Sequence, residues 1–248
     1  ATGKTVKGIA LEAAGLDCRD YDLSRFSAAA VPITSGLGII GGFAKSVDAI
    51  LDRLGMRSRV TSSTDVTGFR EAVESGADIV MMSDDPTFVA YNTRENKFTD
   101  NSWGTAMGYA VCLKNAANGV EGKDVLVVGA GRVGAWAAEI LAGWGAEVKV
   151  TDIVFEKAEA LASVGATPLK NVEKAISENT LVINAAPYII PGEIIAPGSI
   201  ISSPGVPHYY DLEGRTRCKA IIHDPLEIGT AVMAVNSAAY TIKKEEQA

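Results

Sequence analysis

The sequence contains few of the residues on which disulfide-rich, metal-dependent and hydrolytic proteins depend. Among 248 residues there are three cysteines and two histidines. Cys18, Cys112 and Cys218 are scattered and form no C-x-x-C pair, which argues against a disulfide framework or structural zinc and favours a reducing compartment. Neither His208 nor His223 lies beside a serine or cysteine in a nucleophile motif. Hydrolase chemistry and a metal site therefore have little support.

Long hydrophobic runs and an excess of basic residues are also absent. No apolar stretch approaches the roughly 18 residues of a membrane span, and no signal-peptide pattern opens the sequence. We therefore expect no membrane association and a cytoplasmic location. The net charge of −7 argues against nucleic acid as a partner, because phosphate binding requires a basic face. The same charge is compatible with a cationic small-molecule substrate.

The most informative stretch is the glycine motif at residues 123–134 (KDVLVVGAGRVG). A short apolar run breaks into G-x-G-x-x-G, an alanine-rich helical pattern follows to residue 144, and a second apolar run ends at Asp152. The separation from Gly129 to Asp152 is 152 − 129 = 23 residues, close to the roughly 20 of a dinucleotide fingerprint. Strand, glycine turn, helix and strand in this order predict a site for a nicotinamide dinucleotide.

Each position of this motif has a physical role in such a site. Gly129 permits the tight turn, Gly131 lets the backbone approach a pyrophosphate, and Gly134 lets the helix pack closely on the sheet. The helix N-terminus offers N–H groups to the phosphates, and Asp152 would accept hydrogen bonds from the ribose hydroxyls. Asp152 would also repel a 2′-phosphate, so we expect NAD and not NADP. The predicted cofactor-binding residues are Gly129, Gly131, Arg132, Val133, Gly134, Asp152, Ala185, Ala186, Pro187, Pro204 and Gly205.

The pattern of apolar runs predicts an α/β protein with two domains. We expect a smaller N-terminal α/β domain at residues 1–118 and a doubly wound Rossmann NAD domain at residues 119–248, which ends in a helix from residue 227. In the first domain, we expect strands at residues 31–34, 58–62 and 78–83 and a polar loop at 91–101. The apolar face of the last helix could pack internally or against a second subunit, and a homodimer is our expectation.

Candidate substrate-binding residues lie where the predicted strands of the first domain end, because ligands bind at the carboxyl ends of parallel strands. Asp84 and Asp85 could hold an ammonium group and accept its proton; alternatively, one caps a following helix and the other is solvated. Ser35 could bind substrate or only shape its glycine-rich turn. Asn92 could bind substrate or stabilise a loop, and Glu227 could act in catalysis or interact with its helix dipole.

Six segments of the chain resemble the pyrrolysine-biosynthesis dehydrogenases. They occur in order between about residue 30 and residue 235: residues 31–41 (VPITSGLGIIG), 65–69 (DVTGF), 82–88 (MSDDPTF), 128–134 (VGAGRVG), 203–207 (SPGVP) and 224–231 (DPLEIGTA). The glycine fingerprint is generic, whereas the first, third and last segments are specific. Members of this family have a further N-terminal helix that reaches the substrate, and the chain begins with Ala1 about where that helix ends.

The resemblance implies NAD-dependent oxidation of the terminal amine of 3-methylornithyl-N6-lysine, a lysine–methylornithine isopeptide. The resulting imine is hydrolysed to an aldehyde with release of ammonia, and ring closure gives pyrrolysine. We expect Asp84, Ser35 and Glu227 to be catalytic. The expected substrate-binding residues are Ser35, Gly38, Ile39, Gly41, Asp84, Asp85 and Asn92.

Two other functions remain open. One is an amino-acid dehydrogenase of the alanine-dehydrogenase type, which would need a cation for the substrate carboxylate. The first domain offers five arginines for this purpose but no clear motif: Arg53, Arg57, Arg59, Arg70 and Arg94. The other is a non-catalytic NAD-binding regulatory module, because a fold alone does not establish catalysis.

Overall fold

The computed structural model describes residues 1–16, 21–34, 42–206 and 208–247. The chain forms two compact units, and each is drawn from two parts of the sequence. The mixed-sheet unit comprises Thr5–Gly104 and Glu227–Ala248, and the parallel-sheet unit comprises Ala1–Lys4 and Thr105–Leu226. This grouping differs from the division into 1–118 and 119–248, because the last helix packs with the N-terminal part of the chain.

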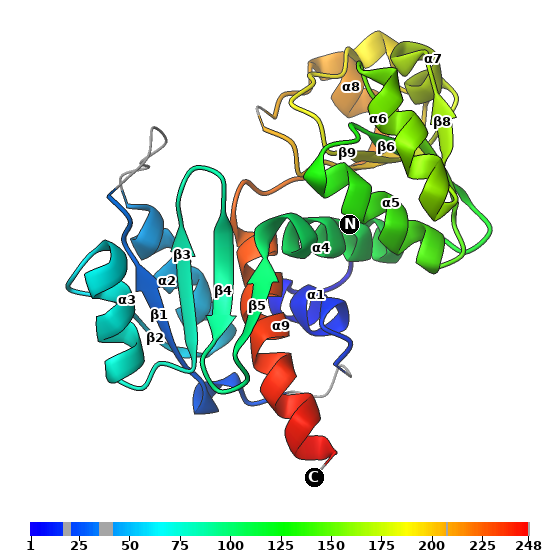
Figure 1. Ribbon diagram of the computed structural model, residues 1–248. Helices are drawn as coiled ribbons and strands as arrows, with labels where there is room; N and C mark the ends of the chain where they lie inside the picture. The colour runs from blue at the N-terminus through cyan, green and yellow to red at the C-terminus, as the bar shows by residue number, and fades with distance from the viewer. Residues whose placement is uncertain (17–20, 35–41, 207, 248) are drawn as a thin grey trace. The chain divides into compact units, whose positions relative to one another are not determined.

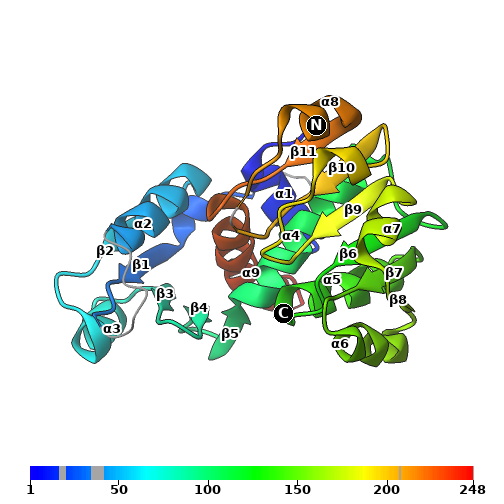
Figure 2. The same cartoon turned by 90° about the horizontal axis from the view of Figure 1, so that it is seen from above.

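The mixed-sheet unit is built on five strands in the order β2-β1-β3-β4-β5 (Figure 1). The first three are parallel, and β4 and β5 form an antiparallel hairpin beside β3. Helices α2 and α9 lie on one face of this sheet and α3 lies on the other (Figure 2). In chain order the elements are α1 (Val6–Ala13), β1 (Ser27–Val31), α2 (Phe43–Leu54), β2 (Arg57–Val60), α3 (Asp65–Glu74), β3 (Ile79–Ser83), β4 (Phe88–Asn92), β5 (Lys97–Asp100) and α9 (Glu227–Glu246).

Two predictions for this unit were wrong. The first strand is β1 and not residues 31–34. The prediction missed β1 because three of its residues are consecutive alanines, which have low strand propensity, yet these alanines are buried in the sheet. The polar segment 91–101 is not a loop. It contains the end of β4, a turn and β5, and its polar residues alternate between the two faces of the hairpin.

Helix α9 is largely buried between Ile228 and Ile242, including Val232, Val235 and Ala239. It packs against α1, α2 and the hairpin strands β4 and β5. The apolar face of α9 is therefore covered by its own chain. Of the two predicted alternatives, packing inside the chain or packing against a second subunit, the structure shows the first.

The parallel-sheet unit contains six strands in the order β11-β10-β9-β6-β7-β8, all parallel. Residues on the central strand alternate between two cores: Val125 and Val127 pack with α5, whereas Leu126 and Val128 pack with α7. This is a doubly wound sheet, and the predicted α/β fold class is confirmed. The elements are α4 (Asn101–Ala116), β6 (Asp124–Val128), α5 (Arg132–Gly143), β7 (Glu147–Thr151), α6 (Phe155–Ala160), β8 (Thr167–Leu169), α7 (Val172–Ser177), β9 (Leu181–Asn184), β10 (Ser199–Ser202), α8 (Leu212–Arg217) and β11 (Cys218–Ile222).

Candidate active site and nucleotide-binding loop

The glycine motif forms the turn between β6 and α5, and two of its glycines leave no room for a side chain. Gly129 has a φ of +94°, and a Cβ there would lie 2.9 Å from the Cβ of Ala186. A Cβ on Gly134 would lie only 1.8 Å from the carbonyl oxygen of Gly129, so the helix starts in direct contact with the turn. These two positions require glycine for steric reasons.

Gly131 lies in a different environment, because a Cβ there would meet no atom within 4 Å. It is exposed and forms the N-cap of α5, with Arg132 and Val133 in the first turn of the helix. The backbone N–H groups at this helix start are those that bind a pyrophosphate in dinucleotide sites. The open space above Gly131 therefore fits a close approach of the phosphates.

Asp152 follows the carboxyl end of β7, beside the glycine turn. One carboxylate oxygen, Oδ2, accepts a hydrogen bond from the Ala130 N–H at 2.7 Å, and Oδ1 accepts one from the Val154 N–H at 2.8 Å. Both oxygens are thus fixed by backbone donors on either side. Each carboxylate oxygen has capacity for a further bond, so this arrangement fits ribose hydroxyls.

The segments after β9 and β10 meet next to the glycine turn. The Ala185 N–H donates to the Val128 carbonyl at 2.8 Å, and the Gly205 N–H donates to the Asn184 carbonyl at 3.1 Å. A Cβ on Gly205 would lie 2.3 Å from the Ala186 carbonyl oxygen. The carboxyl ends of β6, β9 and β10 therefore lie in contact with one another, with Pro187 and Pro204 just beyond, and this is where the cofactor is predicted to bind.

Two histidines stack on each other in this unit, and no sequence motif pointed to them as a functional pair. The rings of His208 and His223 stack with centroids 3.6 Å apart and planes 4° from parallel. His223 Nδ1 lies 2.7 Å from the Ser203 carbonyl oxygen, so this nitrogen carries the proton and donates. Burial, followed by the effects of His223 and Arg215, lowers the pKa of His208. His223 directly follows β11, a position that the sequence showed but that is equally typical of a packing residue.

Asp84 and Asp85 lie at the exposed turn of the β3–β4 hairpin. The Asp84 carboxylate accepts a hydrogen bond from the Thr87 N–H at 2.9 Å. The Asp84 N–H in turn donates to the Thr87 carbonyl, also at 2.9 Å. The alternative in which one aspartate caps a following helix is wrong, because Thr87 leads directly into β4. The hairpin holds the Asp84 carboxylate in a fixed position where it remains accessible to a ligand.

Asn92 is completely buried, and its side chain forms its hydrogen bonds within the mixed-sheet unit. Its amide nitrogen donates to the Ser237 carbonyl at 2.7 Å and to the Thr241 hydroxyl at 3.0 Å. Its carbonyl oxygen accepts from the Glu95 N–H at 2.8 Å. These bonds tie the hairpin to α9, and they favour the structural alternative for this residue.

Glu227 is the first residue of α9, and its carboxylate forms an ion pair with Arg53 of α2 at 2.7 Å. The other four candidate arginines also have partners. Arg57 donates to the Arg25 carbonyl, Arg59 contacts Ser75 and Glu71, Arg70 pairs with Glu74, and Arg94 pairs with Asp78. All five arginines that were considered for a substrate carboxylate are therefore engaged within their own unit.

The remaining predicted residues, Ser35, Gly38, Ile39 and Gly41, lie outside the described part of the chain. Within the described residues, no group of three His, Cys, Asp or Glu side chains is arranged to hold a metal ion. In the same part of the chain, no helix is both long and apolar enough to cross a membrane.

Comparisons with known proteins match two successive parts of the chain to two different families. Residues 1–99 match the N-terminal domain of the pyrrolysine biosynthesis protein PylD, and residues 101–201 match the C-terminal domain of alanine dehydrogenase/PNT. A curated pyrrolysine synthase from Methanosarcina barkeri is 35% identical over 213 residues, which cover 82% of this chain and 78% of that protein.

Solved structures show the same fold at low sequence identity. Shikimate 5-dehydrogenase from Thermus thermophilus, in complex with shikimate, superposes with a TM-score of 0.58 at 16% identity and covers 90% of this chain and 100% of its own. Quinate dehydrogenase from Corynebacterium glutamicum, in complex with NAD, superposes with a TM-score of 0.56 at 16% identity. The match covers 90% of this chain and 98% of the quinate dehydrogenase chain.

Proposed function

The chain belongs to the pyrrolysine synthase family and is an oxidoreductase of the nicotinamide-dependent type, and from this premise we propose that it catalyses the ring-forming dehydrogenation that yields pyrrolysine. The substrate is 3-methylornithyl-N6-lysine. Oxidation converts its terminal amine to an imine, water converts the imine to an aldehyde with release of ammonia, and condensation with the α-amine of the same unit closes the ring with loss of water. The observation that carries the proposal is the glycine turn, complete with Asp152, in a chain of this family.

The residues of the parallel-sheet unit fit a bound NAD. The turn excludes side chains at Gly129 and Gly134, is open above Gly131, and places a fixed carboxylate at Asp152. A 2′-phosphate would bring roughly two negative charges next to this carboxylate, and the neighbouring Ile153 and Val154 offer no compensating cation. We therefore assign NAD, which when bound accepts the hydride that leaves the substrate.

Asp84 is assigned to hold the reacting amine. At neutral pH this amine is an ammonium ion, and hydride can leave its carbon only after the nitrogen has lost a proton, because the nitrogen lone pair forms the new C=N bond. A carboxylate fixed by the Thr87 N–H would orient the ammonium group and help to remove its proton. Ser35 and Glu227 are assigned supporting roles in this step.

Ring closure requires less from the protein than oxidation does. The aldehyde and the amine that attacks it belong to the same molecule, so their effective concentration is high once the chain is folded back. We assign no separate catalytic group to this step.

An amino-acid dehydrogenase of the alanine-dehydrogenase type is the second candidate, because residues 101–201 match that family's C-terminal domain. It would need a cation for the substrate carboxylate, and the five arginines considered for that task are engaged elsewhere. A non-catalytic NAD-binding module is the third candidate, and it predicts cofactor binding without turnover.

The deciding experiment follows NADH formation at 340 nm with 3-methylornithyl-N6-lysine, ornithyl-lysine, alanine and lysine, each with NAD and with NADP. Turnover of the isopeptides with NAD alone supports the proposal, whereas turnover of alanine would identify an amino-acid dehydrogenase. NAD binding without turnover of any substrate would point to the non-catalytic module.

The role of Asp84 is tested by Asp84→Asn, with Asp52→Asn on the exposed side of α2 as the matched control. We expect kcat to fall about 100-fold or more in Asp84→Asn, as for loss of a general base, and to stay unchanged in the control. Unchanged kcat and KM in Asp84→Asn would exclude the assignment.

A further inference from the structure

The two stacked histidines lie in the half of the parallel sheet that takes the second nucleotide of a dinucleotide. A doubly wound sheet with the strand order β11-β10-β9-β6-β7-β8 binds one nucleotide over each half. The glycine turn and Asp152 belong to the half formed by β6, β7 and β8, to which we assign the adenosine. The nicotinamide nucleotide is therefore assigned to β9, β10 and β11. We call His208 and His223 the histidine pair, and His223 directly follows β11.

The histidine pair is attached to the backbone that carries two of the predicted cofactor-binding residues. His223 donates from Nδ1 to the Ser203 carbonyl at 2.7 Å, and its ring stacks on that of His208, which lies between β10 and α8. Pro204 and Gly205 follow Ser203 directly. These contacts place the histidine pair beside the strand ends to which the nicotinamide nucleotide is assigned.

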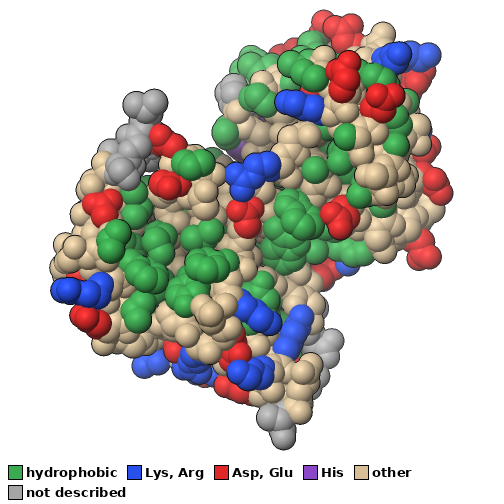
Figure 3. All heavy atoms as spheres, in the orientation of Figure 1, with side chains coloured by type: hydrophobic (Ala, Val, Ile, Leu, Met, Phe, Trp, Pro, Cys, Tyr) green, Lys and Arg blue, Asp and Glu red, His purple; other side chains and the backbone are tan. Residues whose placement is uncertain are grey.

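The surroundings of His208 favour its neutral form. Its Nδ1 is enclosed and has no hydrogen-bond partner among the residues that the structure describes, so the second proton of a histidinium would have no acceptor at this atom. Burial lowers the pKa of His208, and His223 and Arg215 lower it further. Figure 3 shows little histidine surface on the face that it presents, in agreement with the partial burial of both rings.

The groups that face His208 come from three parts of the unit. His223 follows β11, Arg215 lies in α8, and Tyr210 lies just before α8. Arg215 is held close by, because its Nε donates to the Tyr210 carbonyl at 3.0 Å. The Tyr210 ring packs edge-on against His208 with centroids 5.1 Å apart, and burial raises the pKa of its hydroxyl, which therefore stays uncharged. A proton on His208 would thus add to the positive charge of Arg215.

We propose that His208 responds to the charge of the nicotinamide ring: it stays neutral while NAD is bound and binds a proton more readily while NADH is bound. This proposal rests on the NAD site proposed above. The nicotinamide ring carries a positive charge in NAD and none in NADH, whereas the adenosine and the phosphates are common to both. A proton on His208 therefore repels the ring of NAD alone. Its attraction to the phosphates is the same for both cofactors and cancels when the two affinities are compared.

The coupling is reciprocal, so acid should weaken NAD binding more than NADH binding, and NAD should make His208 harder to protonate. Calorimetric titration gives the dissociation constants of NAD, NADH and ADP-ribose, which lacks the nicotinamide, at pH values across the His208 titration that NMR follows. We expect the ratio of the NAD to the NADH dissociation constant to rise at least about 5-fold on protonation. ADP-ribose should behave like NADH, and the pKa of His208 should fall on addition of NAD but not of NADH.

Two variants of His208 separate its charge from its packing. His208→Asn removes the titrating group, so the ratio of the two dissociation constants should no longer depend on pH. His208→Lys adds a positive charge at the same place and should raise the ratio above the pH of the wild-type transition. Ala162→Lys is the matched control, because it adds the same charge at an exposed position between α6 and β8, in the adenosine half of the sheet. The control should leave the ratio unchanged.

Several results would overturn the proposal. One is a ratio that stays constant while NMR shows His208 becoming protonated. Another is an equal fall in the affinities for NAD, NADH and ADP-ribose, which would mean that the histidine pair only stabilises the fold. If His208→Lys fails to fold, His208→Asn and the NMR titration of the wild type still decide the outcome. Failure to bind either cofactor well above the pH of the His208 titration would refute the NAD site itself, and this proposal with it.

Discussion

Gly134→Ala would test most directly how the turn between β6 and α5 is built. The added Cβ would lie 1.8 Å from the Gly129 carbonyl oxygen, whereas ordinary contact begins at 3.4 Å. The helix start or the turn would have to move by about 3.4 − 1.8 = 1.6 Å, and no change of rotamer could relieve the contact because both atoms are fixed to the backbone. Overpacking of this kind costs about 1–3 kcal/mol of folding free energy.

The same displacement would move the N–H groups at the start of α5, so NAD affinity should fall together with stability. Gly131→Ala separates the two effects. Its φ of −76° suits alanine, and the Cβ would meet no protein atom, so we expect a loss of stability of at most about 1 kcal/mol from the poorer N-cap. The methyl group would nevertheless occupy the space into which the pyrophosphate fits, and we expect NAD to bind at least about 10-fold more weakly.

Gly143→Ala, at the other end of the same helix, is the control. A Cβ there also meets no atom within 4 Å, so stability should rise by up to about 1 kcal/mol and NAD affinity should not change. Urea denaturation gives the free energy of unfolding, and calorimetric titration gives NAD affinity. If Gly134→Ala were as stable as the wild type, or if Gly131→Ala bound NAD normally, our account of this turn as a cofactor site would be refuted.

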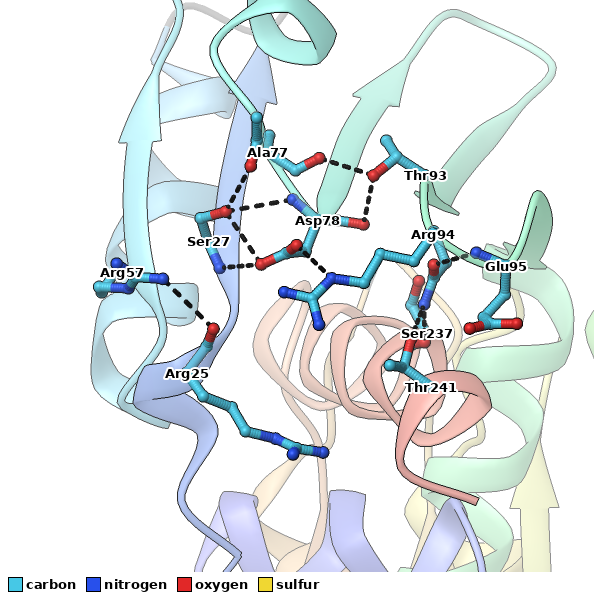
Figure 4. A network of polar contacts seen from close by, with 12 residues as sticks. Arg25, Ser27, Arg57, Ala77, Asp78, Thr93, Arg94, Glu95, Ser237 and Thr241 are labelled. Carbon is cyan, nitrogen blue, oxygen red and sulfur yellow. Dashed lines mark hydrogen bonds and ion pairs between the residues drawn. The ribbon is translucent and has the colours of Figure 1, made fainter. Parts of the chain in front are cut away.

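Two further predictions concern the histidine stack and a buried carboxylate. In an NMR titration, His208 should have a pKa below 6.5, because burial and the adjacent His223 and Arg215 disfavour its charged form. The folded state then favours neutral His208, so this contribution to stability is present above pH 6.5 and is lost as the pH falls through the folded pKa. His223→Gln should raise the pKa of His208 only in part, because burial is the larger cause. A pKa of His208 above 6.5 in the wild type would contradict the reasoning. Asp78, which accepts bonds from the Ser27 N–H at 2.7 Å and Arg94 Nε at 2.6 Å, should lose about 2–3 kcal/mol of unfolding free energy on replacement by alanine in urea denaturation (Figure 4). Glu74→Ala is the control: it removes an exposed ion pair with Arg70 and should cost less than about 1 kcal/mol. Equal losses of unfolding free energy in the two variants would contradict the stabilising role of the Asp78 bonds.

The sequence was sufficient to predict the nucleotide-binding half of the molecule because its signals are local. The turn at Gly129, the close approach at Gly134 and the carboxylate at Asp152 lie within one strand–helix–strand unit, so their spacing along the chain fixes their spacing in space. The two strands of that unit are rich in valine, which has high strand propensity.

The mixed-sheet unit was harder to predict because its structure depends on contacts between distant residues. The alanines of β1 form a strand only because β2 and β3 pair with them on both sides. Asn92 is a polar residue that the sequence places in a loop, yet it is buried because Ser237 and Thr241, about 150 positions later, satisfy its amide. No local pattern connects these residues, so neither the hairpin nor the position of α9 could be read from either segment alone.

The same long-range contacts determine which charges of the mixed-sheet unit can take part in recognition. Arg53 is held by Glu227 at 2.7 Å and Arg94 by Asp78 at 2.6 Å, so these cations neutralise carboxylates of their own unit. The hairpin turn presents the Asp84 carboxylate at an exposed strand end, where the Thr87 N–H holds it in position. An exposed carboxylate at this position, in a unit whose five candidate arginines are engaged elsewhere, suits a substrate with more amines than carboxylates. The isopeptide of our proposal has three amines and one carboxylate, whereas alanine has one of each, so this distribution of charge favours the ring-forming reaction over an amino-acid dehydrogenase.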